Sequence, residues 1–103
     1  MSGAANPERG EAALVLDGIP HVLRPSFEAL VAAEAELGPL FALVERAASG
    51  KLGIAEIAAL FWHCLKEAPA LDRAAFGEAL VAAGLKAITP ALRVLIGQIL
   101  AGR

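Results

Sequence analysis

The pattern of apolar and polar positions changes its period about a quarter of the way along the chain. Before that point two short apolar runs, 12–16 and 19–24, have the composition and length of strands. Asp17 and Gly18 separate the runs, and this pair can supply the positive φ angles of a two-residue type I′ turn. The pattern therefore predicts an antiparallel hairpin with one face packed on helices. Pro20 lacks a backbone N–H, which places the second strand at a sheet edge or the proline at a non-bonded position.

After the hairpin, apolar residues recur at the spacing of a helix, and the residues between the runs mark helix ends. Ser26 can accept a hydrogen bond from the first turn of a helix and so predicts its start. Gly38 and Pro39 end this helix. A second helix follows and ends at Ser49 and Gly50.

Three further helices are predicted in the second half of the chain. The third covers about 54–68 and has the clearest amphipathic face. Asp72 caps a fourth helix, which Gly84 ends. Thr89 and Pro90 then form a start signal, a cap followed by proline at the first helical position, for the last helix.

The fold class that follows is α+β but mostly α, with an N-terminal β-hairpin followed by a compact bundle of about five short helices. A chain of 103 residues fits a single helical domain with its hairpin, residues 11–103, and a mobile N-terminal arm over residues 1–10. The core is expected to contain the apolar residues that recur at helical spacing, namely Leu30, Phe41, Val44, Ile57, Phe61 and Leu65.

Composition supports a helical protein and excludes several functions. Hydrophobic residues make up 57% of the chain, and alanine and leucine, which favour helix, account for most of them. Glu78, Lys86 and Arg93 interrupt the apolar last third, so no stretch reaches the roughly 18 residues of a membrane span. We therefore expect no membrane contact. The N-terminus shows no secretory signal, and a cytoplasmic location is expected.

The formal net charge is −2, and the nine basic residues are scattered along the chain. Nucleic-acid binding usually needs a basic stripe, so no nucleic-acid partner is expected.

No constellation of residues predicts chemistry. Cys64 is the one cysteine, and its apolar helical setting suggests a small core residue. His21 and His63 lack partners at metal-ligand spacing, whereas a zinc site needs three or four converging ligands. No serine has a basic partner, and no phosphate-binding loop is present. We therefore predict no catalytic residue, no metal site, no cofactor and no enzymatic activity.

What remains is surface suited to protein contact. Trp62 lies at the edge of the apolar stripe of the third helix, where it either seals the core or anchors a partner. Val94 and Leu100 lie outside the main stripe of the last helix, so this helix is either buried in the bundle or meets another chain on its outer side. The predicted partner-binding residues are Trp62, Val94 and Leu100.

The first two thirds of the chain also resemble a known family. The resemblance rests on an ordered set of short features, which are Asn6-Pro7 with Arg9-Gly10-Glu11, the Asp17-Gly18 hairpin, Leu23-Arg24-Pro25 with Phe27 and Ala29-Leu30, Glu34 with Gly38, and Gly50-Lys51-Leu52. In this order they resemble the tail-assembly protein family of gene transfer agents and their phage relatives, whose members are called tail assembly chaperones or tail-tube proteins. The resemblance covers roughly residues 5–68.

The resemblance implies a non-enzymatic protein that helps to build a phage-like tail or gene transfer agent particle. It would shield a tail-tube or tape-measure protein, its expected partner, before assembly. A tail tube needs extensive sheet surface, whereas this chain offers one hairpin, so the chaperone is the preferred interpretation. The alternatives are a structural component of the particle and an unrelated small helical adaptor. The sequence leaves self-association open.

Overall fold

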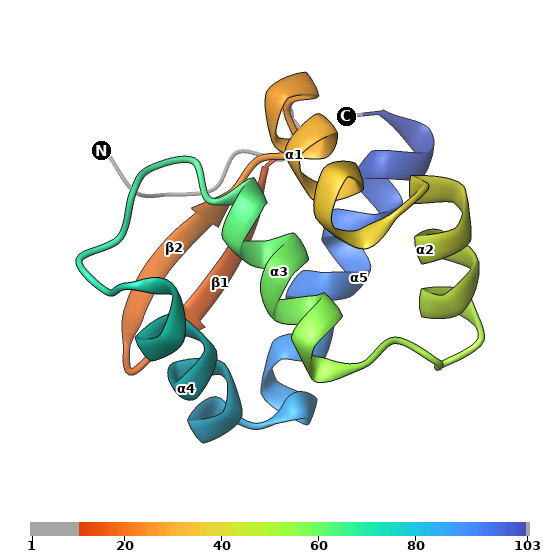
Figure 1. Ribbon diagram of the computed structural model, residues 1–103. Helices are drawn as coiled ribbons and strands as arrows, with labels where there is room; N and C mark the ends of the chain where they lie inside the picture. Colours follow the sequence, from red (N-terminus) through yellow and green to blue (C-terminus); the bar gives the residue numbers. More distant parts are fainter. Residues whose placement is uncertain (1–10, 103) are drawn as a thin grey trace.

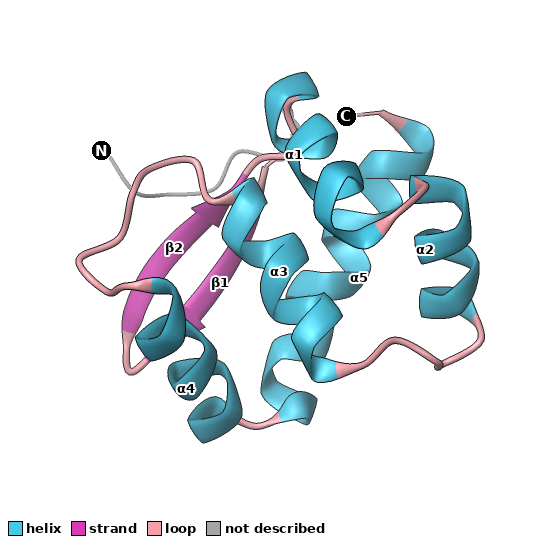
Figure 2. Cartoon of the chain, in the orientation of Figure 1, coloured by secondary structure: helices cyan, strands magenta, loops and turns pink. Residues whose placement is uncertain are grey.

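The computed structural model describes residues 11–102, and the predicted arm over residues 1–10 lies outside them. Over the described residues the chain forms a two-stranded hairpin followed by five helices (Figure 1). The elements are β1 (Ala12–Leu16), β2 (Ile19–Leu23), α1 (Phe27–Leu37), α2 (Leu40–Ala48), α3 (Ile54–Cys64), α4 (Arg73–Ala83) and α5 (Leu85–Ala101). Figure 2 shows that helices dominate and that the hairpin lies at one side. The predicted fold class is confirmed.

The hairpin forms as the sequence predicts. β1 and β2 pair in antiparallel fashion, with Leu16 opposite Ile19 across the turn. Asp17 and Gly18 have φ angles of 52° and 74°, the left-handed conformation that the two-residue turn requires. Leu14 and Leu16 on β1 are buried, while Ala13 and Val15, which alternate with them, are exposed. One face of the hairpin therefore packs on the helices and the other faces solvent.

Helix α3 ends at Cys64, four residues before its predicted end, so that boundary was wrong. Leu65 forms an isolated antiparallel bridge with Leu23 of β2. The Lys66 N–H donates to the Val22 carbonyl oxygen at 2.9 Å. Residues 65 and 66 pair with the free edge of β2, because an edge strand offers unpaired backbone groups. The chain therefore leaves the helical conformation before it reaches Pro69.

Helix α5 begins at Leu85, so the predicted start at Thr89 and Pro90 was wrong. Gly84, with a φ of 91°, is at once the last cap of α4 and the first cap of α5. The Thr89 hydroxyl donates back to the Leu85 carbonyl oxygen at 2.6 Å, as it does inside a helix, and Pro90 lies within α5. Among the described residues no single helix is long and apolar enough to cross a membrane; α4 and α5 would pass only together, across a 112° bend.

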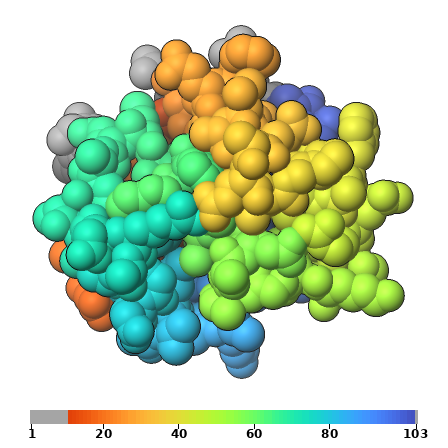
Figure 3. Space-filling view, in the orientation of Figure 1, coloured from red at the N-terminus to blue at the C-terminus, as the bar shows by residue number. Residues whose placement is uncertain are grey.

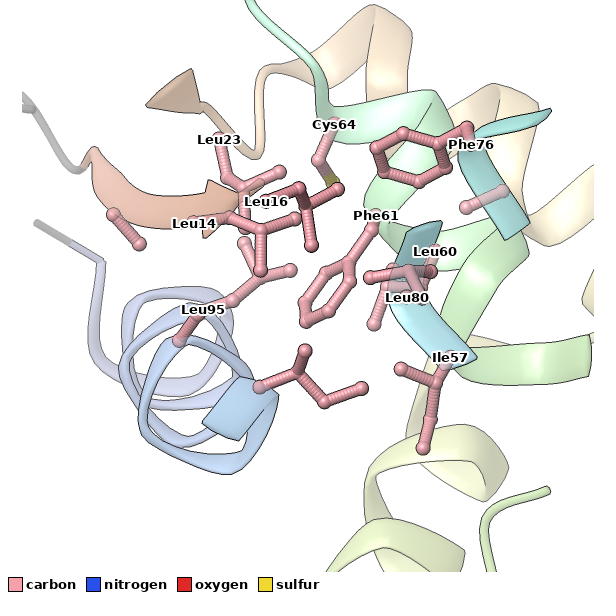
Figure 4. Close-up of a cluster of buried hydrophobic side chains, with 14 of the residues drawn as sticks. Leu14, Leu16, Leu23, Ile57, Leu60, Phe61, Cys64, Phe76, Leu80 and Leu95 are labelled. Atoms are coloured by element: carbon pink, nitrogen blue, oxygen red, sulfur yellow. The ribbon is translucent and has the colours of Figure 1, made fainter. Parts of the chain in front are cut away.

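The core lies between the inner face of the hairpin and helices α3, α4 and α5. Figure 4 shows Phe61 of α3 surrounded by side chains from β1, α4 and α5. Phe61, Phe76 and Leu95 are all fully buried. The predicted core is confirmed for Ile57 and Phe61, which are buried, while Leu30, Val44 and Leu65 are only partly buried.

The placement of Phe41 in the core was wrong, because this side chain is 83% exposed. Leu43 is the residue of α2 that is buried. Two residues along a helix are about 200° apart around its axis, so Leu43 and Phe41 point in nearly opposite directions. When α2 packs through Leu43, Phe41 faces away from the core.

Candidate functional site

Helix α2 lies at the side of the molecule, beside the C-terminal half of α5 (Figure 1). Its main packing is against α1, and its one fully buried side chain is Leu43. At its start the Leu40 N–H donates to Glu34 Oε2 of α1 at 3.0 Å, which satisfies one of the free amides of the first turn. In the space-filling view α2 forms one edge of the molecule (Figure 3). Little of α2 is therefore used to fill the core.

A second attachment joins α2 to the start of α3. Arg46 of α2 forms an ion pair with Glu56 of α3, whose other oxygen accepts a hydrogen bond from the Gly53 N–H at 3.1 Å. The hydrogen bond from Gly53 and then the one from Arg46 lower the pKa of the Glu56 carboxyl. The carboxylate therefore stays charged at neutral pH, and it links α2 to the start of α3.

Two hollows separate α2 from α5. The first has a volume of about 240 Å³ and an entirely uncharged lining, which consists of Leu30, Leu40, Phe41, Val44, Ile99 and Leu100. Phe41 and Leu100 are 83% and 62% exposed, so large apolar side chains border this hollow and face solvent. An apolar concavity of this kind is typical of sites that bind other molecules.

The second hollow is larger, about 560 Å³, and lies further along the same two helices. Small residues of α2, Ala47 and Ala48, form one wall, and Leu92 and Ile96 of α5 form the other. Leu100 lines both hollows, so they are neighbours. We call the two hollows together the α2–α5 groove.

The groove contains one charged side chain. Among the residues that line either hollow, Arg93 alone carries a charge. Its guanidinium has no ion pair or hydrogen bond within residues 11–102. Arg93 is exposed at the border of the second hollow, and its guanidinium can donate two hydrogen bonds to an acidic group.

The structure does not bring the three predicted partner-binding residues together. Leu100 lies in the α2–α5 groove. Val94 is 47% exposed and lies on α5 but lines neither hollow. Trp62 is partly buried against the core, and its ring meets that of Phe76 edge to face, with 5.5 Å between the ring centres. The role of these residues in binding a partner stays a prediction.

Sequence reasoning missed the contribution of α2 to this surface. Phe41 was assigned to the core, and Arg93 was treated only as an interruption of an apolar stretch. The helical phase of α2 offers a signal, since Leu40, Val44 and Ala47 fall on one arc and Phe41 on its border. Which residues of that arc are buried in the core and which line the groove depends on where α5 lies, and the sequence of α2 does not specify this.

The charged cluster that is richest in hydrogen bonds has a structural role. Glu36 of α1 accepts from Arg73 of α4 and is bonded to His63 Nε2 of α3 at 2.8 Å. The Arg73 hydrogen bond, helped by His63, lowers the pKa of the Glu36 carboxyl to about 2. A carboxylate held charged in this way cannot donate a proton near neutral pH, and it links three helices instead.

A free thiol and a cluster of metal ligands are two further features that could carry chemistry. Burial raises the pKa of the Cys64 thiol to about 12, so the reactive thiolate is scarce. Within residues 11–102 no three histidine, cysteine, aspartate or glutamate side chains converge in a way that could hold a metal ion. The α2–α5 groove, by contrast, combines an apolar lining with the exposed side chains of Phe41 and Leu100.

Comparison with known protein families gives a match over most of the chain. The model of the family described as "Phage tail tube protein, GTA-gp10" matches residues 9–102, which is almost the whole chain. No curated protein matches the chain, and no solved structure does so either. The match extends through α5, well beyond the N-terminal two thirds on which the sequence features rest.

Proposed function

Because the chain belongs to the phage tail tube protein family GTA-gp10, we propose that it is a non-enzymatic assembly protein of a phage-like tail or gene transfer agent particle. Its task is to cover an apolar segment of a tail-tube or tape-measure protein before that protein is assembled. The observation that supports this proposal is the α2–α5 groove, with its uncharged first hollow and the exposed side chains of Phe41 and Leu100. The family match sets aside an unrelated helical adaptor.

The mechanism is shielding. An apolar segment of a tail protein is prone to aggregate while it waits for its partners, and a transient cover on that segment prevents this. Only part of the buried area becomes affinity, because association costs translational, rotational and side-chain freedom. Two hollows of about 240 and 560 Å³ therefore suit a complex that must release its partner when the tail is built.

A second candidate is a structural subunit of the particle, and the description of the family as tail tube proteins favours it. The fold weighs against a tube wall made by this chain alone. The described residues provide one two-stranded sheet, whereas a tube built from barrels or sandwiches needs several paired strands per subunit. In this alternative the chain is a helical subunit that associates with other tail proteins or with itself.

Purified particles distinguish the two candidates. The experiment tags the chain, collects both the particle fraction and the particle-free cytoplasmic extract, and measures the amount of the chain per particle by quantitative mass spectrometry. A chaperone is expected in the extract, bound to a tail-tube or tape-measure protein, and absent from finished particles. A stoichiometric amount in mature particles would reject the chaperone and support the structural subunit. The extract also tests the proposed cytoplasmic location.

A further inference from the structure

The single cation in the α2–α5 groove defines the chemistry of its partner. We infer that the groove binds an amphipathic helix of a tail component, and that this helix carries an acidic side chain which pairs with Arg93. The inference rests on the proposed function and adds to it the kind of segment that is bound. Its basis is the charge of the lining, since Arg93 is the one ionic residue among those that border the two hollows.

The shape of the groove favours a helix as the occupant. Most of the lining comes from two helices, α2 and α5, and apolar side chains at helical spacing line the α5 wall at Leu92, Ile96 and Leu100. Ala47 and Ala48 line the opposite wall. Small side chains on a wall let another backbone approach closely, and an apolar helix face laid into a groove is a common mode of peptide recognition.

The charge of Arg93 selects among such helices. If an entirely apolar segment covered Arg93, it would remove water from an unpaired guanidinium, which is costly. A carboxylate in the segment compensates for that cost and accepts two hydrogen bonds from the guanidinium fork. A lysine or arginine at the same place would be repelled, so the charge also rejects wrong segments.

The experiment begins in cells that make particles. A photo-crosslinking amino acid replaces Ala48 on the groove wall, and the control replaces Glu78, an exposed residue of α4 outside the groove. After irradiation, mass spectrometry identifies the captured segment. Capture from position 48, and not from position 78, of a helical segment of a tail protein with an acidic residue is the expected result. Capture of a second copy of this chain, or of a segment without an acidic residue, would overturn the inference.

The captured segment is then made as a fluorescent peptide and titrated with the purified chain. Arg93→Glu should weaken binding about tenfold, whereas Lys86→Glu, a matched reversal at an exposed residue of the same helix outside the groove, should change it less than about twofold. Replacing the acidic residue of the peptide by lysine should restore binding to Arg93→Glu. Equal binding by wild type and Arg93→Glu would overturn the proposed pairing. Because Arg93 is exposed and unpaired within the described residues, this variant should fold normally, which circular dichroism checks.

Failure of the inference can be told from failure of the proposed function. If a tail protein co-purifies with the chain but position 48 captures nothing, the function stands and the groove is not the site. If no tail protein co-purifies from cells making particles, the proposed function itself fails.

Discussion

The Arg24 N–H donates a hydrogen bond to the Cys64 carbonyl oxygen at 2.6 Å, and this bond joins the end of β2 to the last residue of α3. An isolated two-stranded hairpin is at best marginally stable in water. Here the end of β2 is fixed to a helix that also supplies Phe61 to the core. The hairpin is therefore stabilised by the same packing that stabilises the helices. A substitution that weakens either part should lower the stability of both.

The turn of the hairpin gives the first prediction. Gly18→Val should lower the free energy of unfolding by on the order of 1 kcal/mol or more, because a β-branched residue resists the positive φ of 74° at this position. Gly77→Ala is the matched control. Gly77 lies within α4 with open space where a Cβ would be, so alanine should stabilise by roughly 0.5 to 1 kcal/mol. Urea unfolding of both variants measures the difference, and equal stabilities would contradict the assigned turn.

Truncation of two phenylalanines should change stability by very different amounts. Phe61 is fully buried, and Phe61→Ala should cost roughly 3 to 5 kcal/mol of stability because it leaves a cavity in the core. Phe41 is 83% exposed, and Phe41→Ala should change stability by less than about 0.5 kcal/mol. Thermal and chemical unfolding compare the two variants. A large loss of stability from Phe41→Ala would show that this side chain belongs to the core.

The Glu36 carboxylate predicts a dependence of stability on pH. Its pKa in the folded chain is about 2, below the ordinary value of 4.5, because Arg73 and His63 bond its charged form. A lowered carboxyl pKa stabilises the fold above pH 4.5, and this contribution is lost as the pH falls from there to about 2. The melting temperature of wild type should therefore exceed that of Glu36→Gln at neutral pH, and the gap should close over this range.

Glu78→Gln serves as the control for that measurement, since Glu78 is exposed and has no ion pair among the described residues. It should show no comparable gap at any pH. A gap between wild type and Glu36→Gln that persisted unchanged to pH 2 would show that the carboxylate charge is not what stabilises the three-helix cluster.

Binding and stability should separate at Leu100 and Val94, the two predicted contact residues that are exposed. Leu100→Asp should weaken the complex with a tail component by at least about 1 kcal/mol, because Leu100 lines both hollows, and should leave the melting temperature nearly unchanged. Val94→Asp should have a smaller effect on binding, since Val94 lies outside the groove. Trp62→Ala should lower stability, because its ring packs on Phe76. Pull-downs with parallel thermal melts test all three. Loss of binding from Val94→Asp alone would move the contact surface to the other side of α5.

Signals between residues close in the sequence account for the local structure. Asp17 and Gly18 specify the turn because the allowed φ angles of these residues are a local property. Ser26 and Asp72 cap α1 and α4, accepting from amides three residues ahead at 3.2 Å and 2.8 Å, and this too depends only on nearby residues. Leu100 could be singled out as lying outside the core stripe of its helix. The order and type of all the elements followed from such rules.

Long-range contacts set the helix ends and the buried faces wherever they compete with local signals. Helix α3 stops at Cys64 because the edge of β2, about 40 residues earlier in the chain, accepts and donates backbone hydrogen bonds there. Phe41 is exposed because the packing of α2 on α1 selects Leu43 for burial. The α2–α5 groove exists because those two helices are held apart by contacts that each makes with other elements. Periodicity identifies the apolar face of a helix. Which element covers that face depends on the positions of the other helices, and a local pattern does not specify those positions.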